Sequence, residues 1–229
     1  MNIPVHLAII PDGNRRWANE HNLPVYEGHK KGFQAVSDLG KKSRDLGIRI
    51  FTVWAFSTEN WKRDKNEIAF LMQNYRDWID KNLKTALKEK IRIIHIGRKD
   101  RLEKNLKHKL EEAEEKTKTF NKYYFVVALD YGGRDEIIRS AKKIQNQKSK
   151  LQNLTEENFG RFLDTKDLPQ PYPDLIIRTS GEFRTSGFMI WQAAYSEWMF
   201  PKKYLPDFTT EDLEDCIKEY FLRKRKYGI

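Results

Sequence analysis

The pattern of apolar and polar positions along the chain predicts strands that alternate with helices. Five short runs are nearly continuously apolar and rich in β-branched or aromatic residues. Such runs are typical of parallel strands that are covered on both faces. The predicted strands are Val5–Ile10, Ile48–Phe56, Ile91–Ile96, Tyr123–Leu129 and Leu175–Ile177.

Between these runs, apolar residues recur at helical spacing, and the first helix is expected to end at Gly47. Alternation of this kind indicates an α/β fold with a central, mainly parallel sheet surrounded by helices. Because no internal repeat or low-complexity linker is found, we expect residues 1–229 to form a single domain. The predicted helices are His29–Leu46, Glu67–Lys88, Arg101–Lys118, Arg134–Gln147 and Thr209–Lys226.

The composition is typical of a folded chain, with 39% hydrophobic and 13% aromatic residues. No apolar run approaches the roughly 20 residues of a membrane span, and the N-terminus reaches a Pro-Asp-Gly turn too soon for a signal peptide. A single cysteine, Cys216, excludes an internal disulfide framework. We therefore expect a cytoplasmic location.

The net charge of +10 predicts an anionic partner, which could be nucleic acid, a membrane surface or a phosphorylated small molecule. Lysines scattered on helices are more simply a solvated face. Proteins with open parallel sheets bind their ligands at the carboxyl ends of the strands. Basic residues in the loops at that edge are therefore the candidates for binding an anion.

The first such loop reads PDGNRR over residues 11–16. Gly13 and Asn14 suit a tight turn, and a helix that begins there would favour an anion. Arg16 can make a bidentate contact with phosphate. Asp12 is unfavourable beside an anion unless a cation intervenes, which predicts a bridging Mg²⁺ ion. The alternative is an ordinary turn capped by Asp12. Neither a P-loop nor a G-x-G-x-x-G motif is present.

The second loop offers Ser57, Asn60 and Arg63 as donors after another predicted strand. Asn60 and Trp61 could equally form a structural turn and a packed aromatic contact. This segment alone does not distinguish a binding loop from a structural turn.

The third loop carries Arg178, Arg184 and Ser186 after the last predicted strand. Two arginines flanking Ser and Gly are suited to clamp a diphosphate, whereas the alternative is ion pairing, for example with Glu182. Downstream, Glu197 lies in an apolar, aromatic stretch. A carboxylate in such a place is either paired structurally or bound to a metal.

These segments together follow the order and spacing of a known family. The motifs are HLAIIPDGNRRWA, GHKKG, AFSTENWKR with Glu67, DYGGRDEI, DLIIRTSGEFRTSGFMIWQAAYSE and, over residues 223–228, RKRKYG. They resemble the cis-prenyltransferases, most closely the bacterial undecaprenyl diphosphate synthases, over nearly the whole chain.

The resemblance implies an enzyme that condenses isopentenyl diphosphate in cis onto an allylic diphosphate, usually farnesyl diphosphate. It implies a Mg²⁺-dependent homodimer that makes a long-chain polyprenyl diphosphate, the precursor of the undecaprenyl lipid carrier for cell-wall synthesis. We expect transient contact with the inner face of the membrane, and we expect no nucleic acid partner.

The resemblance also assigns roles to single residues. Asp12 and Glu197 match metal-associated carboxylates, and Asn60 matches the position that the family assigns to proton abstraction. Because an amide has little basicity, we expect Asn60 to position a substrate while diphosphate or water takes the proton. The expected substrate-binding residues are Gly13, Asn14, Arg15, Arg16, Trp17, His29, Ser57, Thr58, Glu59, Trp61, Arg63, Arg178, Arg184, Thr185 and Ser186.

The chain departs from the family's common pattern at Pro11, Arg15, Val25 and Gly187, and two of these departures are related. Family members commonly have Gly where this chain has Arg15, and Arg where it has Val25. We expect Arg15 to compensate for the missing diphosphate contact.

A long hydrocarbon product requires an apolar tunnel, although the same side chains could be ordinary helix core. The expected tunnel walls are Phe70, Leu71, Tyr75, Trp78 and Leu87.

Two other functions stay open. A basic nucleic-acid-binding protein would use the charge of +10 but leaves the three strand-end loops unexplained. A noncatalytic subunit that supports a partner is disfavoured because the motif residues, Asp12 and Asn60 among them, are retained.

Overall fold

The apolar runs form a single parallel sheet. The structure, a computed structural model, describes residues 3–146 and 154–223. Within these residues, six strands lie in the order β3-β4-β2-β1-β5-β6, and every neighbouring pair is parallel. The strands are β1 (His6–Ile10), β2 (Ile50–Ser57), β3 (Ile91–Ile96), β4 (Tyr123–Tyr131), β5 (Leu175–Arg178) and β6 (Glu197–Met199).

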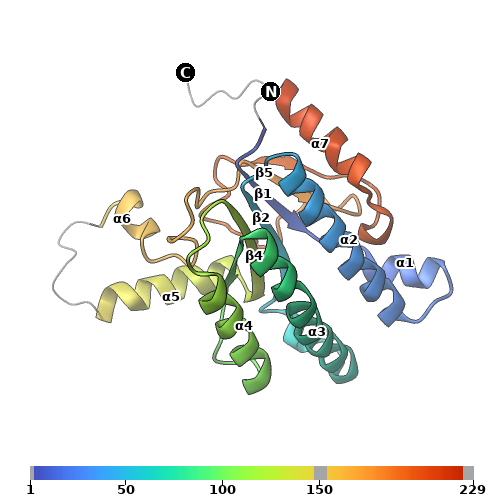
Figure 1. The fold of residues 1–229 in the computed structure, drawn as a ribbon, viewed down its shortest axis with the longest axis horizontal. Coiled ribbons are helices and arrows are strands. Elements are labelled where there is room, and N and C mark those ends of the chain that lie inside the picture. Colours follow the sequence, from blue (N-terminus) through green and yellow to red (C-terminus); the bar gives the residue numbers. More distant parts are fainter. Residues whose placement is uncertain (1–2, 147–153, 224–229) are drawn as a thin grey trace.

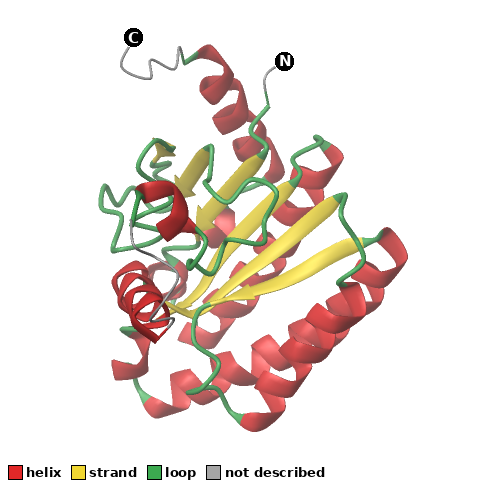
Figure 2. Cartoon of the chain, turned by 90° about the vertical axis from the view of Figure 1, so that its left-hand side faces the viewer, coloured by secondary structure: helices red, strands yellow, loops and turns green. Residues whose placement is uncertain are grey.

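Helices lie on both sides of this sheet (Figures 1 and 2). Helices α2, α3, α4 and α7 cover one face, and α5 with the segment that follows it covers the other. The helices are α1 (Asn14–Glu20), α2 (Val25–Asp45), α3 (Lys65–Glu89), α4 (Lys104–Thr117), α5 (Gly133–Asn146), α6 (Glu156–Gly160) and α7 (Thr210–Leu222).

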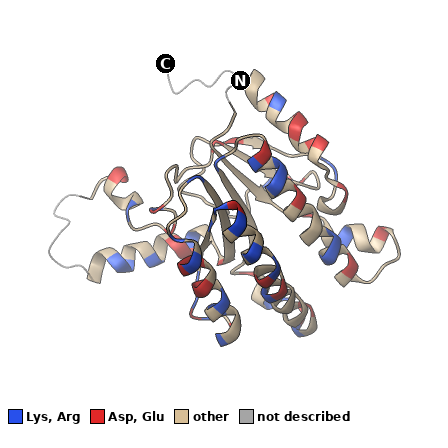
Figure 3. Cartoon of the chain, viewed as in Figure 1, with Lys and Arg blue, Asp and Glu red and all other residues tan. Residues whose placement is uncertain are grey.

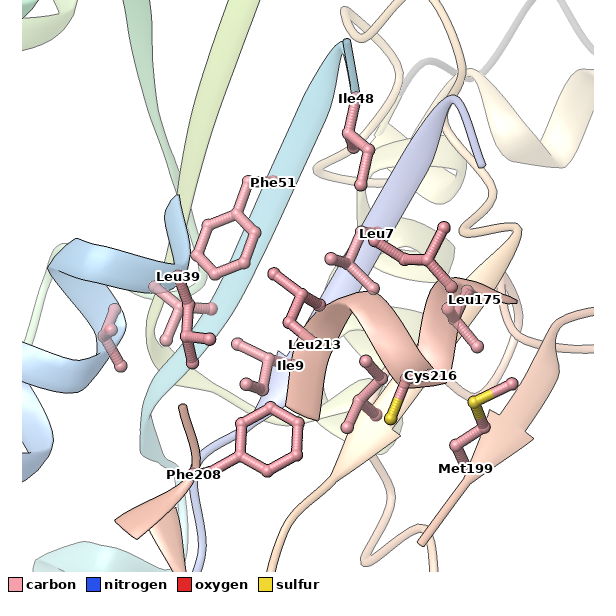
Figure 4. Packing of buried hydrophobic residues seen from close by; sticks show 14 of the residues in the cluster. Leu7, Ile9, Leu39, Ile48, Phe51, Leu175, Met199, Phe208, Leu213 and Cys216 are labelled. Atoms are coloured by element: carbon pink, nitrogen blue, oxygen red, sulfur yellow. The ribbon is translucent and has the colours of Figure 1, made fainter. Parts of the chain in front are cut away.

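The alternation of side chains along β1 divides the core between the two faces. Leu7 and Ile9 pack against Leu39 of α2 and Leu213 of α7 (Figure 4), whereas Ala8 faces the other layer. Successive strand residues point to opposite faces, so a strand that is buried on both faces is apolar throughout. Each buried Leu or Ile contributes about 1.5–3 kcal/mol of transfer free energy.

The predicted strands and helices are all present, with ends that shift by a few residues. Three of the strands and α-helices were not predicted: the short strand β6, the five-residue helix α6 and the seven-residue helix α1, which was considered only as a possible start after the first loop. All three are too short to give a periodic pattern. The predicted helix ends at Gln147 and Lys226, and positions 224–228 of the C-terminal motif, lie outside the described residues.

Helix α2 begins at Val25, earlier than predicted, because Gly28 is an interior helix residue rather than a start signal. A Cβ atom on Gly28 would lie 2.1 Å from the backbone oxygen of Asn14. The glycine therefore allows α1 to pack directly on α2, which places the loop after β1 against the helix.

Charged residues are spread over the helices, with Lys and Arg positions beside Asp and Glu positions (Figure 3). Many form helical pairs, such as Lys116 with Glu112 at 2.6 Å. This distribution supports the interpretation of the surface lysines as a solvated face. In the part of the chain that is described, no helix combines the length and apolar character needed to cross a membrane.

We predict that the buried side chain of His6 makes stability depend on pH. Its ring nitrogens contact Gln170 O at 2.8 Å and Thr52 Oγ1 at 2.7 Å, and burial lowers the pKa of His6 to about 4. The neutral ring is favoured in the folded chain, so its contribution is complete above pH 6.5 and is lost as the pH falls toward 4. This shift corresponds to about 3 kcal/mol.

Urea unfolding between pH 7 and pH 4 measures this effect. The wild-type protein should lose more unfolding free energy over this range than His6→Gln. The control variant His108→Gln, which changes an exposed histidine, should follow the wild type. Equal pH slopes for wild type and His6→Gln would contradict the prediction.

Candidate active site

The connections between strands place the candidate loops together. The chain crosses from β1 to β2 by way of α2 on one face, and from β4 to β5 by way of α5 on the other. Neighbouring strands whose connections leave on opposite faces create a crevice at their carboxyl ends. Asp12 follows β1 and Arg178 ends β5, so the two residues meet at this crevice.

The loop after β1 is fixed to β5 by its backbone. Asp12 N–H donates to Thr179 Oγ1 at 2.9 Å, and the same hydroxyl donates to Asp12 O at 2.8 Å. Gly13 has φ of 99°, a backbone angle that glycine adopts without strain, and its N–H donates to Asp12 Oδ1 at 2.7 Å. The turn therefore aims the Asp12 carboxylate at the arginines of the neighbouring loop.

Asp12 lies between two guanidinium groups. Arg178 Nη2 donates to one carboxylate oxygen at 2.7 Å, and Arg16 Nη2 donates to the other at 3.2 Å. Burial alone would raise the pKa of Asp12. The hydrogen bond and charge of Arg178, with Gly13 N–H and Arg16, outweigh burial and hold this pKa below its usual value. The carboxylate is therefore ionised at neutral pH.

The arginines of the third loop extend this network. Arg178, whose side chain is only 5% exposed, donates to Ser186 Oγ at 2.8 Å and to Arg184 O. Arg16 donates to Ser180 Oγ at 2.6 Å and to Glu182 Oε1 at 2.8 Å. The ion pair with Glu182 that the sequence left as an alternative is thus present, within the loop cluster rather than elsewhere on the surface.

These loops form the mouth of a cavity of about 630 Å³. The polar part of the lining includes five arginine side chains and one histidine near two carboxylates, and the inner part is aliphatic and aromatic. The polar lining includes Asp12, Asn14, Arg15, Arg16, His29, Ser57, Asn60, Arg63, Arg178, Glu182, Arg184 and Ser186. The inner lining includes Phe33, Val36, Val53, Leu71, Tyr75, Trp78, Phe125 and Val127.

The predicted tunnel walls are partly confirmed. Leu71, Tyr75 and Trp78 line the cavity. Phe70 and Leu87 do not, and the prediction for these two is wrong because they lie on other sides of α3, where Leu87 is 39% exposed. The rings of Trp78 and Phe125, 4.9 Å apart, pack together in the inner lining.

The loop after β2 brings only some of its residues to the cavity. Ser57, Asn60 and Arg63 line it, whereas Thr58, Glu59 and Trp61 do not. Asn60 Oδ1 accepts from Ser57 N–H at 3.0 Å, so Asn60 also has the structural role that the sequence left open.

Trp61, which does not line the cavity, has a structural role. Its Nε1–H donates to Asp130 at 2.9 Å, and Arg101 pairs with the same buried carboxylate. These contacts fix the loop to the end of β4.

His29 and Arg15 meet at one carboxylate, that of Glu67. His29 Nε2 lies 3.2 Å from Glu67 Oε1, Arg63 donates to the same oxygen at 3.1 Å, and Arg15 lies 3.8 Å from Oε2. Burial lowers the pKa of His29, against the opposing effect of Glu67. Sequence reasoning placed Glu67 in a motif but did not identify it as the residue that links α2, α3 and the β1 loop. Val25 lies at the start of α2 and does not line the cavity.

Three further predicted site residues lie outside the cavity. Trp17 is buried beside α2, and its Nε1–H donates to Asp207 at 2.8 Å. Thr185 is exposed next to the cavity residues Arg184 and Ser186. Glu197, for which a metal role was predicted, is the third of these residues.

The structure does not bring Glu197 to Asp12 within one chain. Glu197 pairs with Leu175 at the start of β5, whereas Asp12 follows the end of β1. Its carboxylate accepts from Arg223 at 2.8 Å. Among the described residues, no three His, Cys, Asp or Glu side chains form a group that could hold a metal. An ionised Asp12 at the cavity mouth nevertheless fits Mg²⁺, which is commonly bound by one or two carboxylates together with substrate phosphates.

Comparisons with known proteins find similarity along almost the whole length of the chain. The model of the prenyltransferase family described as putative undecaprenyl diphosphate synthase matches residues 10–228. An isoprenyl transferase of Thermotoga maritima is 45% identical, with 100% of this chain and 98% of that protein covered. A ditrans,polycis-undecaprenyl-diphosphate synthase of Micrococcus luteus, named as specific for (2E,6E)-farnesyl diphosphate, is 40% identical, with 99% and 92% covered.

Two solved structures share the fold. Lavandulyl diphosphate synthase from Lavandula x intermedia, in complex with dimethylallyl diphosphate, is 35% identical with a TM-score of 0.95, and 99% of each chain is covered. A probable undecaprenyl diphosphate synthase from Campylobacter jejuni is 34% identical with a TM-score of 0.83, and 100% of each chain is covered.

Proposed function

The chain belongs to the prenyltransferase family of undecaprenyl diphosphate synthases, and from this membership we propose that it elongates farnesyl diphosphate to undecaprenyl diphosphate. It is a cis-prenyltransferase, as the resemblance implied. The observation that carries the choice of substrate is the cavity, which joins an arginine-rich mouth to an aliphatic and aromatic interior. An amphiphile with a diphosphate head and a hydrocarbon tail matches both parts.

The polar mouth has the groups that departure of a diphosphate needs. Arg16 would hold the allylic diphosphate, and Arg178 with Arg184 and Ser186 would hold that of isopentenyl diphosphate. Positive groups fixed before the reaction stabilise the charge that develops on the leaving diphosphate. Asp12 would hold Mg²⁺ together with the phosphates, and that ion, when bound, supplies further neutralisation of the same charge.

The remaining steps follow from the substrates. The allylic carbon left electron-poor is attacked by the double bond of isopentenyl diphosphate, and a proton then leaves the adduct. Holding both substrates side by side removes the entropic cost of their meeting. Asn60 shapes the loop through Ser57 N–H. We assign the proton to diphosphate or water, because an amide is a poor base.

A direct test incubates the purified protein with farnesyl diphosphate, labelled isopentenyl diphosphate and Mg²⁺. We expect a series of products that differ by one isoprene unit. Absence of every elongated product would contradict the proposal.

The proposal includes the setting of the reaction. We take the active species to be a cytoplasmic homodimer that contacts the membrane transiently and supplies the lipid carrier precursor for cell-wall synthesis. Gel filtration with light scattering and a vesicle sedimentation assay test the dimer and the membrane contact.

We predict that the Trp78 ring limits product length. Trp78 packs on Phe125 in the inner cavity, and its Nε1–H donates to Ser37 Oγ at 3.0 Å. Trp78→Leu removes the ring but keeps an apolar wall, so products should become longer by one or more isoprene units. Mass spectrometry of the products measures the change.

The matched control for this prediction is Phe70→Leu, which lies on the same helix but outside the cavity lining. Its product distribution should equal that of the wild type. If Trp78→Leu also gives the wild-type distribution, the ring does not limit length.

A further inference from the structure

Glu182, in the cavity mouth, joins Arg16 and Arg184, two arginines that are assigned to different substrates. Glu182 Oε1 accepts from Arg16 Nη1 at 2.8 Å, and Glu182 Oε2 accepts from Arg184 Nη1. Its side chain is only 24% exposed, and it lines the same cavity as both arginines. A phosphate group that contacted both guanidinium groups would present its oxygens to the same donors.

We propose that Glu182 is an internal competitor of the substrate diphosphates, and that its release couples the two substrate sites. The inference rests on the proposed function, because it takes Arg16 and Arg184 to bind the diphosphates of the two substrates. A diphosphate that binds either arginine must displace the carboxylate from that arginine.

The bridging geometry is the reason for coupling. The two ion pairs share one carboxylate, which hangs from a loop with φ of 75° at Ser180 and 69° at Gly181. Displacement of the carboxylate by a first diphosphate weakens its hold on the second arginine. Binding of one substrate therefore raises the affinity for the other, and the effect is reciprocal.

Asp12 also joins arginines that are assigned to different substrates, Arg16 and Arg178, but it is not the displaceable carboxylate. It pairs with Arg178 and Arg16 but makes no contact with the Arg184 guanidinium, which is bonded to Glu182. Asp12 is also fixed by its own turn through Gly13 N–H. The displaceable contact is therefore assigned to Glu182.

The first test is a calorimetric titration with inorganic pyrophosphate at a fixed Mg²⁺ and salt concentration. Glu182→Gln keeps the shape of the side chain and removes its charge, so pyrophosphate should bind roughly three- to tenfold more tightly than to the wild type. Glu103→Gln removes the charge from another Glu–Arg pair, with Arg76, outside the cavity lining, and should bind like the wild type. Equal or weaker binding by Glu182→Gln overturns the proposal.

The second test measures coupling. The affinity for isopentenyl diphosphate is determined with and without farnesyl thiolodiphosphate, an unreactive analogue. The analogue should raise this affinity in the wild type and should not do so in Glu182→Gln. Glu182→Asp keeps the charge but is too short to bridge both arginines, so it should also lose the coupling. Coupling of wild-type size in both variants overturns the proposal.

These results separate the inference from the proposed function. If Glu182 had only a structural role, Glu182→Gln would bind pyrophosphate more weakly than the wild type and would have a lower melting temperature. The proposal predicts the opposite change in pyrophosphate affinity. If wild type and Glu182→Gln both elongate farnesyl diphosphate and bind pyrophosphate equally, Glu182 is not a competitor and the proposed function stands. If neither elongates it, the proposed function fails, and the pyrophosphate titration still decides the role of Glu182.

Discussion

Replacement of Asp12 by Asn is expected to lower kcat/KM by about 10²- to 10³-fold, mostly through kcat. The amide keeps the size of the side chain but removes the negative charge of the carboxylate, which Arg178 and Arg16 keep ionised in the wild type. Loss of this charge removes the residue that would hold Mg²⁺ against the diphosphate, so charge on the leaving group is less well neutralised. Steady-state kinetics with farnesyl and isopentenyl diphosphate measure the loss.

The matched control for Asp12→Asn is Asp100→Asn. Asp100 also pairs with an arginine, Arg98, but does not line the cavity. This variant should keep wild-type kinetics. Thermal unfolding of both variants must accompany the kinetics, because Asp12 compensates a guanidinium that is almost fully buried. A folded Asp12→Asn protein with activity within about tenfold of the wild type would be incompatible with the assigned role.

The second large effect is expected at Arg178. Its guanidinium contacts Asp12, Ser186 and the carbonyl of Arg184 at once, and a lysine ammonium cannot reproduce this planar set of contacts. Arg178→Lys should raise the KM for isopentenyl diphosphate by roughly 10- to 100-fold. It should also lower the melting temperature, since the loop of Asp12 and the loop of Arg184 and Ser186 lose a shared partner.

Arg139→Lys separates binding from stability in this experiment. Arg139 pairs with Asp135 and Asp164, has a side chain that is 20% exposed, and does not line the cavity. Arg139→Lys should lower the melting temperature and leave the KM unchanged. If Arg178→Lys behaves in the same way, Arg178 is structural and the isopentenyl diphosphate site must be sought elsewhere.

The location of Asp12 and Arg178 at one edge of the sheet could be predicted because it depends only on strand direction. Their direct contact also requires the pairing of β1 with β5, which the apolar pattern does not determine. Apolar runs identify buried parallel strands, and residues that follow adjacent strands share one edge of the sheet. The bridge made by Glu182 could not be predicted in the same way. It depends on the path of a loop with positive φ at Ser180 and Ser186, which residue spacing does not determine.

The tunnel walls show a second limit of sequence reasoning. Helical periodicity identified the apolar residues of α3 but not which of them face the cavity, so Leu71 was placed correctly and Phe70 was not. Phe33 and Phe125 were missed because they belong to α2 and β4, and their contact with α3 arises only from packing. Trp17 was assigned from a motif, whereas the hydrogen bond from its indole to Asp207 joins segments far apart in the sequence.

The absence of a side chain at Gly28 has a consequence for enzyme engineering. Asn14 lies directly against α2, so a change in the position of α2 would be transmitted to α1. The same α2 presents Phe33 and Val36 to the tunnel. Remodelling α2 to change tunnel depth would shift the diphosphate loop as well. Product length is better redesigned from α3 and β4, where the wall can be altered while the alignment of the reacting groups is left in place.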